Sequence, residues 1–362
     1  MPKISISKQQ LINGLSVVSK AIQVNPVIPL YSSLLFVSTK ENATLYATDF
    51  ELSVSVKLFS NGDEFTTAIP AKLFSDVINI YPDDEVNMEF DKISQSMKIA
   101  SDTSKNNIKC LNSDDFVTMK KFSKHSVTVN STVFKSAISR VSFCAIKDSE
   151  ASGILKGIQL SRKDNKLVLF AADGFHMSKE EVPVKFSNDN DFNVIVKSST
   201  LDTICKMLQE DEDLFISASD SQLEIKNGNI NISCQVLSGK FPDYKQLIVD
   251  KSDTIVSLSV SSLKQGCKQL ELFTDNKISF SINGALVKMN TESDQRGESE
   301  YQTFANVEGN PIELNLNVFL LRQLLDVCFT EEVILELNTS RSPVVAKMKD
   351  YPAFYHIIMP IN

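Results

Sequence analysis

The sequence lacks the signatures of several enzyme classes. Histidine occurs only three times in 362 residues, at His125, His176 and His356, and no His-Glu-x-x-His motif is present. With so few imidazoles and no closely spaced cysteine pair, the sequence predicts no metal site and no cofactor. A Walker-type phosphate loop and a Gly-x-Ser-x-Gly motif are also missing. Their absence argues against an ATPase and against a serine hydrolase.

Acidic residues do not complete a catalytic site either. Asp173 and His176 lie close together in the sequence, but without a partnered nucleophile. The acidic runs 83–85 and 211–213 are typical of solvated turns rather than of a two-metal nuclease. We therefore expect no catalytic residues.

Long apolar runs and paired cysteines are missing as well. The six cysteines are scattered singly, as is typical of buried thiols in a reducing compartment. No apolar run is long enough to span a bilayer. Met1–Ile22 is amphipathic, whereas a signal peptide would be continuously apolar. We therefore expect a cytoplasmic protein with no membrane partner.

What the sequence does contain is a long repeat. Ile4–Ile22 has the pattern of a short alternating strand, a polar cap and an amphipathic helix. The same pattern returns at Ser126–Ile146 and again at Thr254–Phe273. The spacing of about 125–130 residues is that of a domain rather than of a solenoid unit. The expected helix caps are Ser7, Asn130 and Ser261.

A second helical pattern keeps step with the first. It covers Ile69–Tyr81, Val196–Leu208 and Asn315–Cys328. A chain of 362 residues is expected to hold two or three domains, and the repeat favours three. The sequence therefore predicts three copies of one domain, at residues 1–122, 123–250 and 251–362.

The net charge of the chain is −8, but its basic residues recur at particular places in the sequence. An acidic chain is not typical of a nucleic-acid partner. Yet lysine and arginine recur on the predicted helices of all three copies. On one helix they indicate only a solvated face, but their recurrence fits equally well a surface that touches phosphates without reading bases. These residues are Lys8, Lys20, Lys72, Lys135, Arg140, Lys197, Lys206, Lys264, Lys268 and Arg322.

Three short stretches stand apart from the repeat. Ala172-Asp173-Gly174 predicts a tight turn. The stretch Gly239–Tyr244 has the sequence GKFPDY, which is also explained by a turn with two aromatic anchors. The chain ends in Met-Pro-Ile-Asn at 359–362, where a terminal strand closing a core is the simplest interpretation. Because proline cannot donate to a central strand ladder, we expect this tail to lie over the surface instead.

Together, the length, the repeat and these three motifs occur in the order typical of the bacterial DNA polymerase III beta subunit family, the replicative sliding clamps. The whole chain resembles that family. The resemblance implies an α+β fold of three tandem clamp-type domains, each with two helices packed on antiparallel sheets. It also implies a head-to-tail homodimer that forms a ring, with the helices lining the hole.

The function implied by the resemblance is that of a DNA polymerase processivity factor, a non-catalytic accessory subunit in DNA replication. Its expected partners are double-stranded DNA bound without sequence preference, the DNA polymerase III alpha subunit, the clamp loader and other proteins with clamp-binding motifs. Two loop positions are added to the DNA-facing residues, Asn25 and Ser149, where the family often has arginine and glutamine. The alternative is a non-catalytic, all-β interaction protein that does not encircle DNA.

A peptide-binding groove is implied by the same resemblance. Apolar and sulfur-bearing side chains suit such a groove because they adapt to varied short ligands. The family often has His-Arg where this chain has Phe175-His176, and arginine where it has Gln246, so the location of the groove is predicted better than its ligand preference. The matching positions are Leu155, Ala172, Gly174, Phe175, His176, Met177, Pro242, Gln246, Leu247, Pro343, Val344, Ile357, Met359, Pro360 and Ile361.

The dimer contact is implied in the same way. Leu272 and Phe273, at the end of the third copy's first helix, would meet a first-copy strand of the partner that contains Asn106 and Ile108. Ile108 is the expected apolar partner. The alternative for Phe273 is an ordinary core position.

Overall fold

The computed structural model describes residues 1–23, 26–119, 127–147, 153–186, 191–242, 244 and 251–361. The chain forms two compact units, each built from two stretches. The first unit comprises Met1–Thr132 and Lys185–Val236, and the second comprises Val133–Val184 and Leu237–Asn362. Each unit thus contains one terminal copy of the repeat and part of the middle copy. The boundaries predicted after residues 122 and 250 fall outside the described residues.

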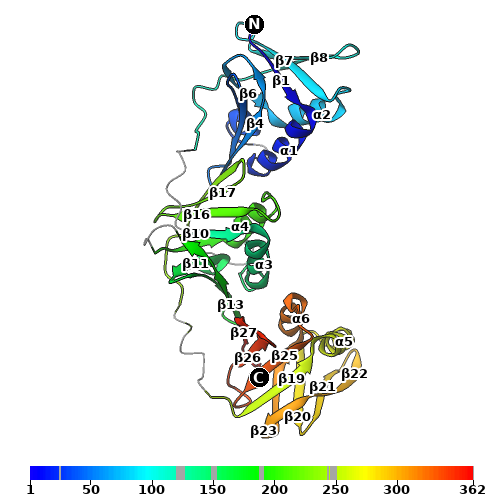
Figure 1. Ribbon diagram of the computed structural model, residues 1–362. Coiled ribbons are helices and arrows are strands. Elements are labelled where there is room, and N and C mark those ends of the chain that lie inside the picture. Colours follow the sequence, from blue (N-terminus) through cyan, green and yellow to red (C-terminus); the bar gives the residue numbers. More distant parts are fainter. Residues whose placement is uncertain are drawn as a thin grey trace. The chain divides into compact units, whose positions relative to one another are not determined.

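The secondary structure follows the repeat (Figure 1). The first copy contains β1 (Lys3–Ser7), α1 (Lys8–Val18), the 3-10 helices η1 (Ser19–Ala21) and η2 (Pro29–Ser32), β2 (Ser33–Ser38), β3 (Asn42–Thr48), β4 (Leu52–Phe59), β5 (Asn61–Gly62), β6 (Phe65–Pro70), α2 (Ala71–Ile80), β7 (Glu85–Asp91), β8 (Ser96–Ala100) and β9 (Lys105–Lys109). The middle copy contains β10 (Val127–Asn130), α3 (Ser131–Ser142), η3 (Ile154–Lys156), β11 (Gly157–Lys163), β12 (Lys166–Ala172), β13 (His176–Pro183), β14 (Lys185–Phe186), β15 (Asn193–Lys197), α4 (Ser198–Cys205), β16 (Asp213–Ala218), β17 (Gln222–Asn227) and β18 (Ile230–Gln235). The third copy contains β19 (Thr254–Ser259), α5 (Val260–Leu270), β20 (Lys277–Asn283), β21 (Leu286–Ser293), β22 (Gly297–Phe304), β23 (Asn306–Gly309), β24 (Ile312–Asn317), α6 (Val318–Val327), β25 (Glu332–Leu337), β26 (Val344–Met348) and β27 (Tyr351–Ile358).

Each copy contains two strand-to-helix connections, as the repeat predicted. In the first connection β1, β10 and β19 lead directly into α1, α3 and α5, and in the second β6, β15 and β24 lead into α2, α4 and α6. The α-helices have 8 to 12 residues. Among the described residues, none of the helices has the length and apolar character needed to cross a membrane. Three domains with two α-helices each on antiparallel sheets are therefore confirmed.

The helix caps agree with the sequence in two copies and differ in the third. Ser7 is the N-cap residue of α1, although its side chain makes no capping bond. The amide oxygen of Asn130 accepts a hydrogen bond from Thr132 N at 2.9 Å. The prediction of Ser261 is wrong, because Ser259 is the N-cap of α5 and its side chain accepts from Ser262 N. The helix therefore begins at Val260, two residues earlier than expected. The side chain of Val260 is buried.

Two sheets build the first unit. One has the order β5-β1-β7-β8-β9, and the other has the order β14-β10-β16-β17-β18-β4-β3-β2-β6. Antiparallel pairing of β18 with β4, in which Ile230 lies opposite Val56, joins strands of the middle copy to strands of the first. We call this junction the first seam.

The second unit is built in the same way. One sheet has the order β22-β21-β20-β24, and another runs β11-β12-β13-β27-β26-β25-β19-β23. Here β13 of the middle copy pairs with β27 of the third, with Met177 opposite Ile357. We call this junction the second seam.

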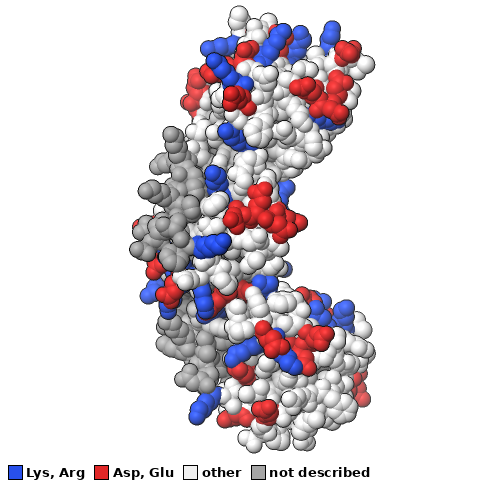
Figure 2. All heavy atoms as spheres, in the orientation of Figure 1, with Lys and Arg blue, Asp and Glu red and all other residues white. Residues whose placement is uncertain are grey.

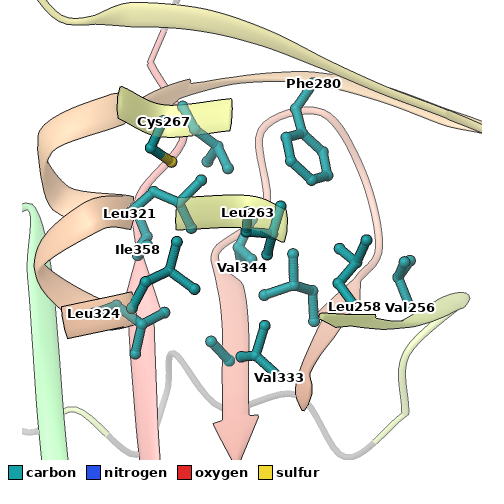
Figure 3. Close-up of a cluster of buried hydrophobic side chains, with 14 of the residues drawn as sticks. Val256, Leu258, Leu263, Cys267, Phe280, Leu321, Leu324, Val333, Val344 and Ile358 are labelled. Carbon is teal, nitrogen blue, oxygen red and sulfur yellow. The ribbon is translucent and has the colours of Figure 1, made fainter. Parts of the chain in front are cut away.

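The core of the third copy lies between its helices and its sheets. α5 and α6 lie side by side (Figure 1), and Leu263 and Leu321 from these helices belong to one buried cluster with Val333 of β25 (Figure 3). All three side chains are fully buried. Burying a leucine or valine side chain contributes roughly 1.5–3 kcal/mol, so the apolar face of each helix holds it on the sheet. Burial also raises the pKa of the Cys267 thiol in this core to about 12.

Candidate functional site

A pocket of about 240 Å³ lies at the second seam. The turn between β12 and β13 provides one wall, the segment that follows β18 provides another, and the tail after β27 provides a third. A concave site lined mainly by apolar side chains is typical of ligand binding. Its lining residues are Leu155, Phe170, Ala172, Gly174, Phe175, His176, Met177, Phe241, Pro242, Tyr244, Ile357 and Met359.

The first wall owes its shape to Asp173. Its carboxylate oxygen Oδ1 accepts hydrogen bonds from the backbone N–H groups of Phe175 and His176, at 2.8 and 2.9 Å. Gly174, between Asp173 and Phe175, has a φ of 96°, a conformation that residues with a Cβ rarely adopt. The turn therefore holds Phe175 outward, with 66% of its surface exposed at the rim of the pocket.

Aromatic side chains form the second wall. The ring of Phe170 lies edge-on to that of Phe241 at 5.2 Å and stacks on that of Tyr244 at 4.1 Å. Close packing fixes this segment, because a Cβ on Gly239 would meet Cγ2 of Ile154 at 2.5 Å. The predicted pair of aromatic anchors is thus part of the pocket. Sequence reasoning missed Phe170 as their partner, although it lies on the alternating strand that ends at the predicted turn.

The C-terminal tail forms the third wall. Met359 N donates a hydrogen bond to the carbonyl oxygen of Phe175 at 2.9 Å, and Ile361 N donates to that of Asn315 at 3.0 Å. Met359, Pro360 and Ile361 are half-buried. Two backbone bonds therefore hold the tail along the surface instead of inside a sheet.

The structure brings most of the predicted groove residues together, but not all. The expected residues that line the pocket are Leu155, Ala172, Gly174, Phe175, His176, Met177, Pro242, Ile357 and Met359. Val344 pairs with Ile358, belongs to the core of the third copy and does not line the pocket. Pro343, Pro360 and Ile361 do not line the pocket. Gln246 and Leu247 lie outside the described residues.

A polar cluster lies behind the apolar lining and was not predicted. It joins His176 to Cys144, Ser178 and His356, all of them buried. Burial raises the pKa of the Cys144 thiol well above its usual value, and burial together with the nearby His176 lowers the pKa of His356 well below its own. Cys144 and His356 are 212 residues apart, so no local spacing in the sequence could have revealed their contact.

Comparison with known proteins agrees with this architecture. Models of three DNA polymerase III beta subunit domains match the chain in succession: the N-terminal domain at residues 2–120, the central domain at 128–243 and the C-terminal domain at 245–362. Together they span nearly the whole chain. The chain belongs to the DNA polymerase III beta subunit family.

Individual members of the family are distant relatives. A beta sliding clamp of Staphylococcus epidermidis is 24% identical and one of Staphylococcus aureus is 22% identical, each over the full length of both chains. The fold is similar to the crystal structure of the DNA polymerase sliding clamp from Bacillus subtilis, with a TM-score of 0.93, 19% identity and coverage of 100% and 99% of the two chains. A putative DNA polymerase III beta subunit from Eubacterium rectale gives a TM-score of 0.92 at 23% identity, with full coverage of both chains.

The basic residues that were predicted to face DNA differ in exposure. Lys20, Lys72, Lys206 and Lys268 are exposed, whereas Lys8, Lys135, Lys197, Lys264 and Arg322 are half-buried. Lys264 lies 3.7 Å from Asp326, and Arg322 lies 3.0 Å from Glu271. Figure 2 shows basic and acidic side chains interspersed on the displayed face, not one continuous basic patch. Asn25 and Ser149 lie outside the described residues.

Arg140 does not fit the expected role of a DNA-facing residue. Its guanidinium lies 2.7 Å from Oε1 of Glu180, with side-chain exposures of only 12% and 0%. Tyr351 donates its hydroxyl to the same oxygen at 2.6 Å. Burial and Glu180 raise the pKa of Tyr351 to about 12. Arg140 therefore forms an internal ion pair. Removing it would leave the buried Glu180 carboxylate without its charged partner, which is strongly destabilising.

The residues expected at the dimer contact lie on accessible edges, with one exception. β9, which contains Asn106 and Ile108, is the last strand of its sheet among the described residues. Leu272 is 72% exposed and Phe273 is half-buried. Ile108 is only 2% exposed. Its side chain belongs to the core of its own domain, so the expectation that it offers an apolar contact to a partner is corrected.

Proposed function

We propose that this chain is a DNA polymerase processivity clamp. Two copies close head to tail into a ring around duplex DNA, and the pocket at the second seam holds short peptides of the polymerase and other partners. The chain acts as an accessory subunit without catalysis of its own, and its partners include the DNA polymerase III alpha subunit and the clamp loader. The observation that carries this proposal is the match of three successive family domains over nearly the whole chain. Its domains divide near residues 122 and 250.

Two strand edges support ring closure. Among the strands that the structure describes, β9 ends one sheet of the first unit and β22 ends one sheet of the second, and a strand edge without a neighbour is a template for pairing with another chain. β9 carries exposed Lys105 and Lys109, whereas β22 carries exposed Glu298 and Glu300. In our proposal β9 of one copy adds to β22 of its partner. The opposite charges would select this pairing over pairing of like edges.

Sequence-independent DNA contact is supported by the exposed lysines on helices of both units. Lys72 follows the first residue of α2, and Lys268 lies in the last turn of α5. Exposed cations of this kind bind phosphate through counterion release, which carries no base information and weakens in salt. Such contacts allow a ring to slide.

Peptide binding is supported by the pocket itself. Met177 and Met359 give two of its walls an adaptable surface, and Phe170 gives a rigid one. This combination suits short apolar segments of differing sequence. The six cysteines are unpaired thiols, as expected in a reducing compartment, and we place the protein in the cytoplasm.

Retention on closed DNA tests the proposal. Loaded with a clamp loader onto nicked circular plasmid, the protein should remain bound in salt that removes ordinary surface binders, and linearising the plasmid should release it. Equal loss from circular and linear DNA would contradict encirclement and favour an interaction protein that does not surround DNA.

The ring contact has its own test. Leu272→Asp should dissociate the dimer in light scattering while circular dichroism stays unchanged, because a charge would replace an apolar contact. Ile80→Asp is the matched control, since Ile80 is 79% exposed at the end of α2 and belongs to neither β9 nor β22. Reversing Lys105 and Lys109 to glutamate should weaken the dimer, and reversing Glu298 and Glu300 to lysine in the same chain should restore it. A dimer insensitive to all these changes would place the contact elsewhere.

A further inference from the structure

Behind the groove, three side chains with metal-binding atoms meet in the interior. Cys144 follows α3, His176 opens β13 and His356 lies in β27. Sγ of Cys144 lies 3.6 Å from Nδ1 of His176 and 3.7 Å from Nδ1 of His356. The three ligating atoms all lie within 4.8 Å of one another. None of the three residues is more than 4% exposed.

The cluster gathers several lone pairs around two hydrogens, one on the Cys144 thiol and one on the Ser178 hydroxyl. Nε2 of His176 lies 3.2 Å from the Asp173 carboxylate, a contact that places a ring proton on Nε2 and leaves Nδ1 as an acceptor. The thiol of Cys144 can donate to one neighbour only, yet it faces both imidazoles and Oγ of Ser178 at 3.2 Å. The Ser178 hydroxyl can donate to Nδ1 of His356 at 2.7 Å, whereas a cation at the centre would take lone pairs from the thiolate and both imidazoles at once.

We infer that Cys144, His176 and His356 bind Zn²⁺ or a chemically similar divalent transition metal. In a tetrahedral zinc site with Zn–S of about 2.3 Å and Zn–N of about 2.0–2.1 Å, sulfur and nitrogen are about 3.6 Å apart. Both sulfur–nitrogen distances in this cluster agree with that value. A thiolate with two imidazoles suits zinc, cobalt, nickel or copper rather than magnesium or calcium, which prefer oxygen ligands.

The surroundings complete the site. Oγ of Ser178 lies 2.7 Å from Nδ1 of His356, a hydrogen-bond distance, so this hydroxyl would turn away from that nitrogen when a metal binds. Asp173 orients His176 from the outside, in the way that a carboxylate orients a metal-bound histidine through its other ring nitrogen. The ring of Phe143 packs against both imidazoles, at 5.6 and 5.3 Å between centroids. The ligands are therefore held in place before any metal binds.

A metal here would tie together three segments that are far apart in the chain. Cys144 is 32 residues from His176 and 212 from His356. It would link the end of α3 to both strands of the second seam, directly behind Met177 and Ile357 of the groove. The sequence predicted no metal site because it shows no local motif. The fold assembles the ligands from separate copies of the repeat.

Cobalt titration tests the inference on the intact chain. After dialysis against chelator, Co²⁺ should bind with one equivalent per chain and produce the near-ultraviolet charge-transfer absorption of a cobalt–thiolate bond, and Zn²⁺ should abolish that absorption by displacement. Zn²⁺, but not Mg²⁺, should raise the midpoint of thermal unfolding of the wild-type protein.

Variants separate this site from adventitious binding. Cys144→Ala should eliminate the charge-transfer band, whereas Cys267→Ala should retain it, because Cys267 lies in the core of the third copy. Asp173→Asn should keep the band but weaken the affinity roughly 10- to 100-fold, as expected for loss of an outer-shell partner. Absence of the band in the wild-type protein, or its persistence in Cys144→Ala, would overturn the inference. Because the wild-type measurement stands alone, a variant that fails to fold does not decide the result.

Discussion

The two seams of the molecule are built alike and differ in what fills them. At the first seam the side-chain Nε2 of Gln235, just after the pairing of β18 with β4, donates to the carbonyl oxygen of Phe50 at 2.9 Å. At the second seam Met359 N, just after β27, donates to the carbonyl oxygen of Phe175 at the same distance. In both, an aspartate caps the turn, Asp49 in the first and Asp173 in the second.

Aromatic side chains occupy the first seam from within. Tyr31 is buried and packs on Phe50 at 4.3 Å and on Phe116 at 6.1 Å between ring centroids. Its equivalent at the second seam is Leu155, which, like Tyr31, lies two residues before a strand. Leu155 lines the open pocket instead of filling it. The comparison shows that aromatic side chains of the molecule itself pack at the first seam, whereas a pocket stays open at the second.

Deleting Met359–Asn362 should have the largest effect. The ring should still assemble and remain on circular DNA, because both strands of the second seam stay paired. Binding of a short peptide containing glutamine, leucine and phenylalanine should be lost, since one wall of the pocket is gone. Calorimetric titration of that peptide before and after the deletion measures the change. Undiminished affinity of the truncated ring would place the peptide elsewhere.

Truncating Tyr31 and Leu155 should separate stability from binding. Tyr31→Ala should lower the free energy of unfolding by about 3 kcal/mol, because a large buried aromatic side chain leaves a cavity, and should leave peptide affinity unchanged. Leu155→Ala should cost less stability, because Leu155 is half-buried, and should reduce peptide affinity. Denaturant unfolding and calorimetry of both variants make the comparison, and the reverse assignment of effects would contradict it.

The capping aspartates should respond oppositely to acid. Burial raises the pKa of Asp49. Burial also opposes ionisation of Asp173, but its contacts with His176 and two backbone N–H groups outweigh that, and the pKa lies below its usual value. Ionised Asp173 therefore stabilises the fold above the unfolded-state pKa of about 4, and this contribution disappears as the pH falls through the lower folded pKa. Ionised Asp49 destabilises the fold at neutral pH, and acid removes that cost.

Asparagine variants measure this difference. In chelator at neutral pH, Asp173→Asn should lose about 1 kcal/mol of unfolding free energy, a modest value because the side chain is partly exposed. Asp49→Asn should lose none, because it removes a charge that burial makes unfavourable. The gap between the two variants should close as the pH falls below about 4. A gap that is constant with pH would show that the two turns do not differ in their charge.

The repeat could be predicted because strand and helix periodicities are local properties of the chain. The order of elements, the turn at Asp173 and the aromatic pair Phe241 and Tyr244 all follow from neighbouring residues. Exposure could not be predicted in the same way. Arg140 has the spacing of a surface residue on α3, but Glu180 of β13 meets it in the fold, and Val344 becomes part of a core.

Contacts between copies are also hidden from the sequence. Cys144 and His356 meet only because β27 of the third copy pairs with β13 of the middle copy. Phe170 belongs to an ordinary alternating strand, and nothing local distinguishes it from other buried residues until Tyr244 stacks on it. The parts of the site that depend on such pairings required the structure.

Calorimetric titration of one short peptide into the wild-type ring and into Leu155→Tyr tests the central claim most directly. The variant places in the second seam the residue that packs within the first. The wild-type ring should bind one peptide per chain, and Leu155→Tyr should remain a folded dimer on circular DNA while losing that binding. Equal binding by both proteins would contradict the assignment of the open seam as the site that recruits partners.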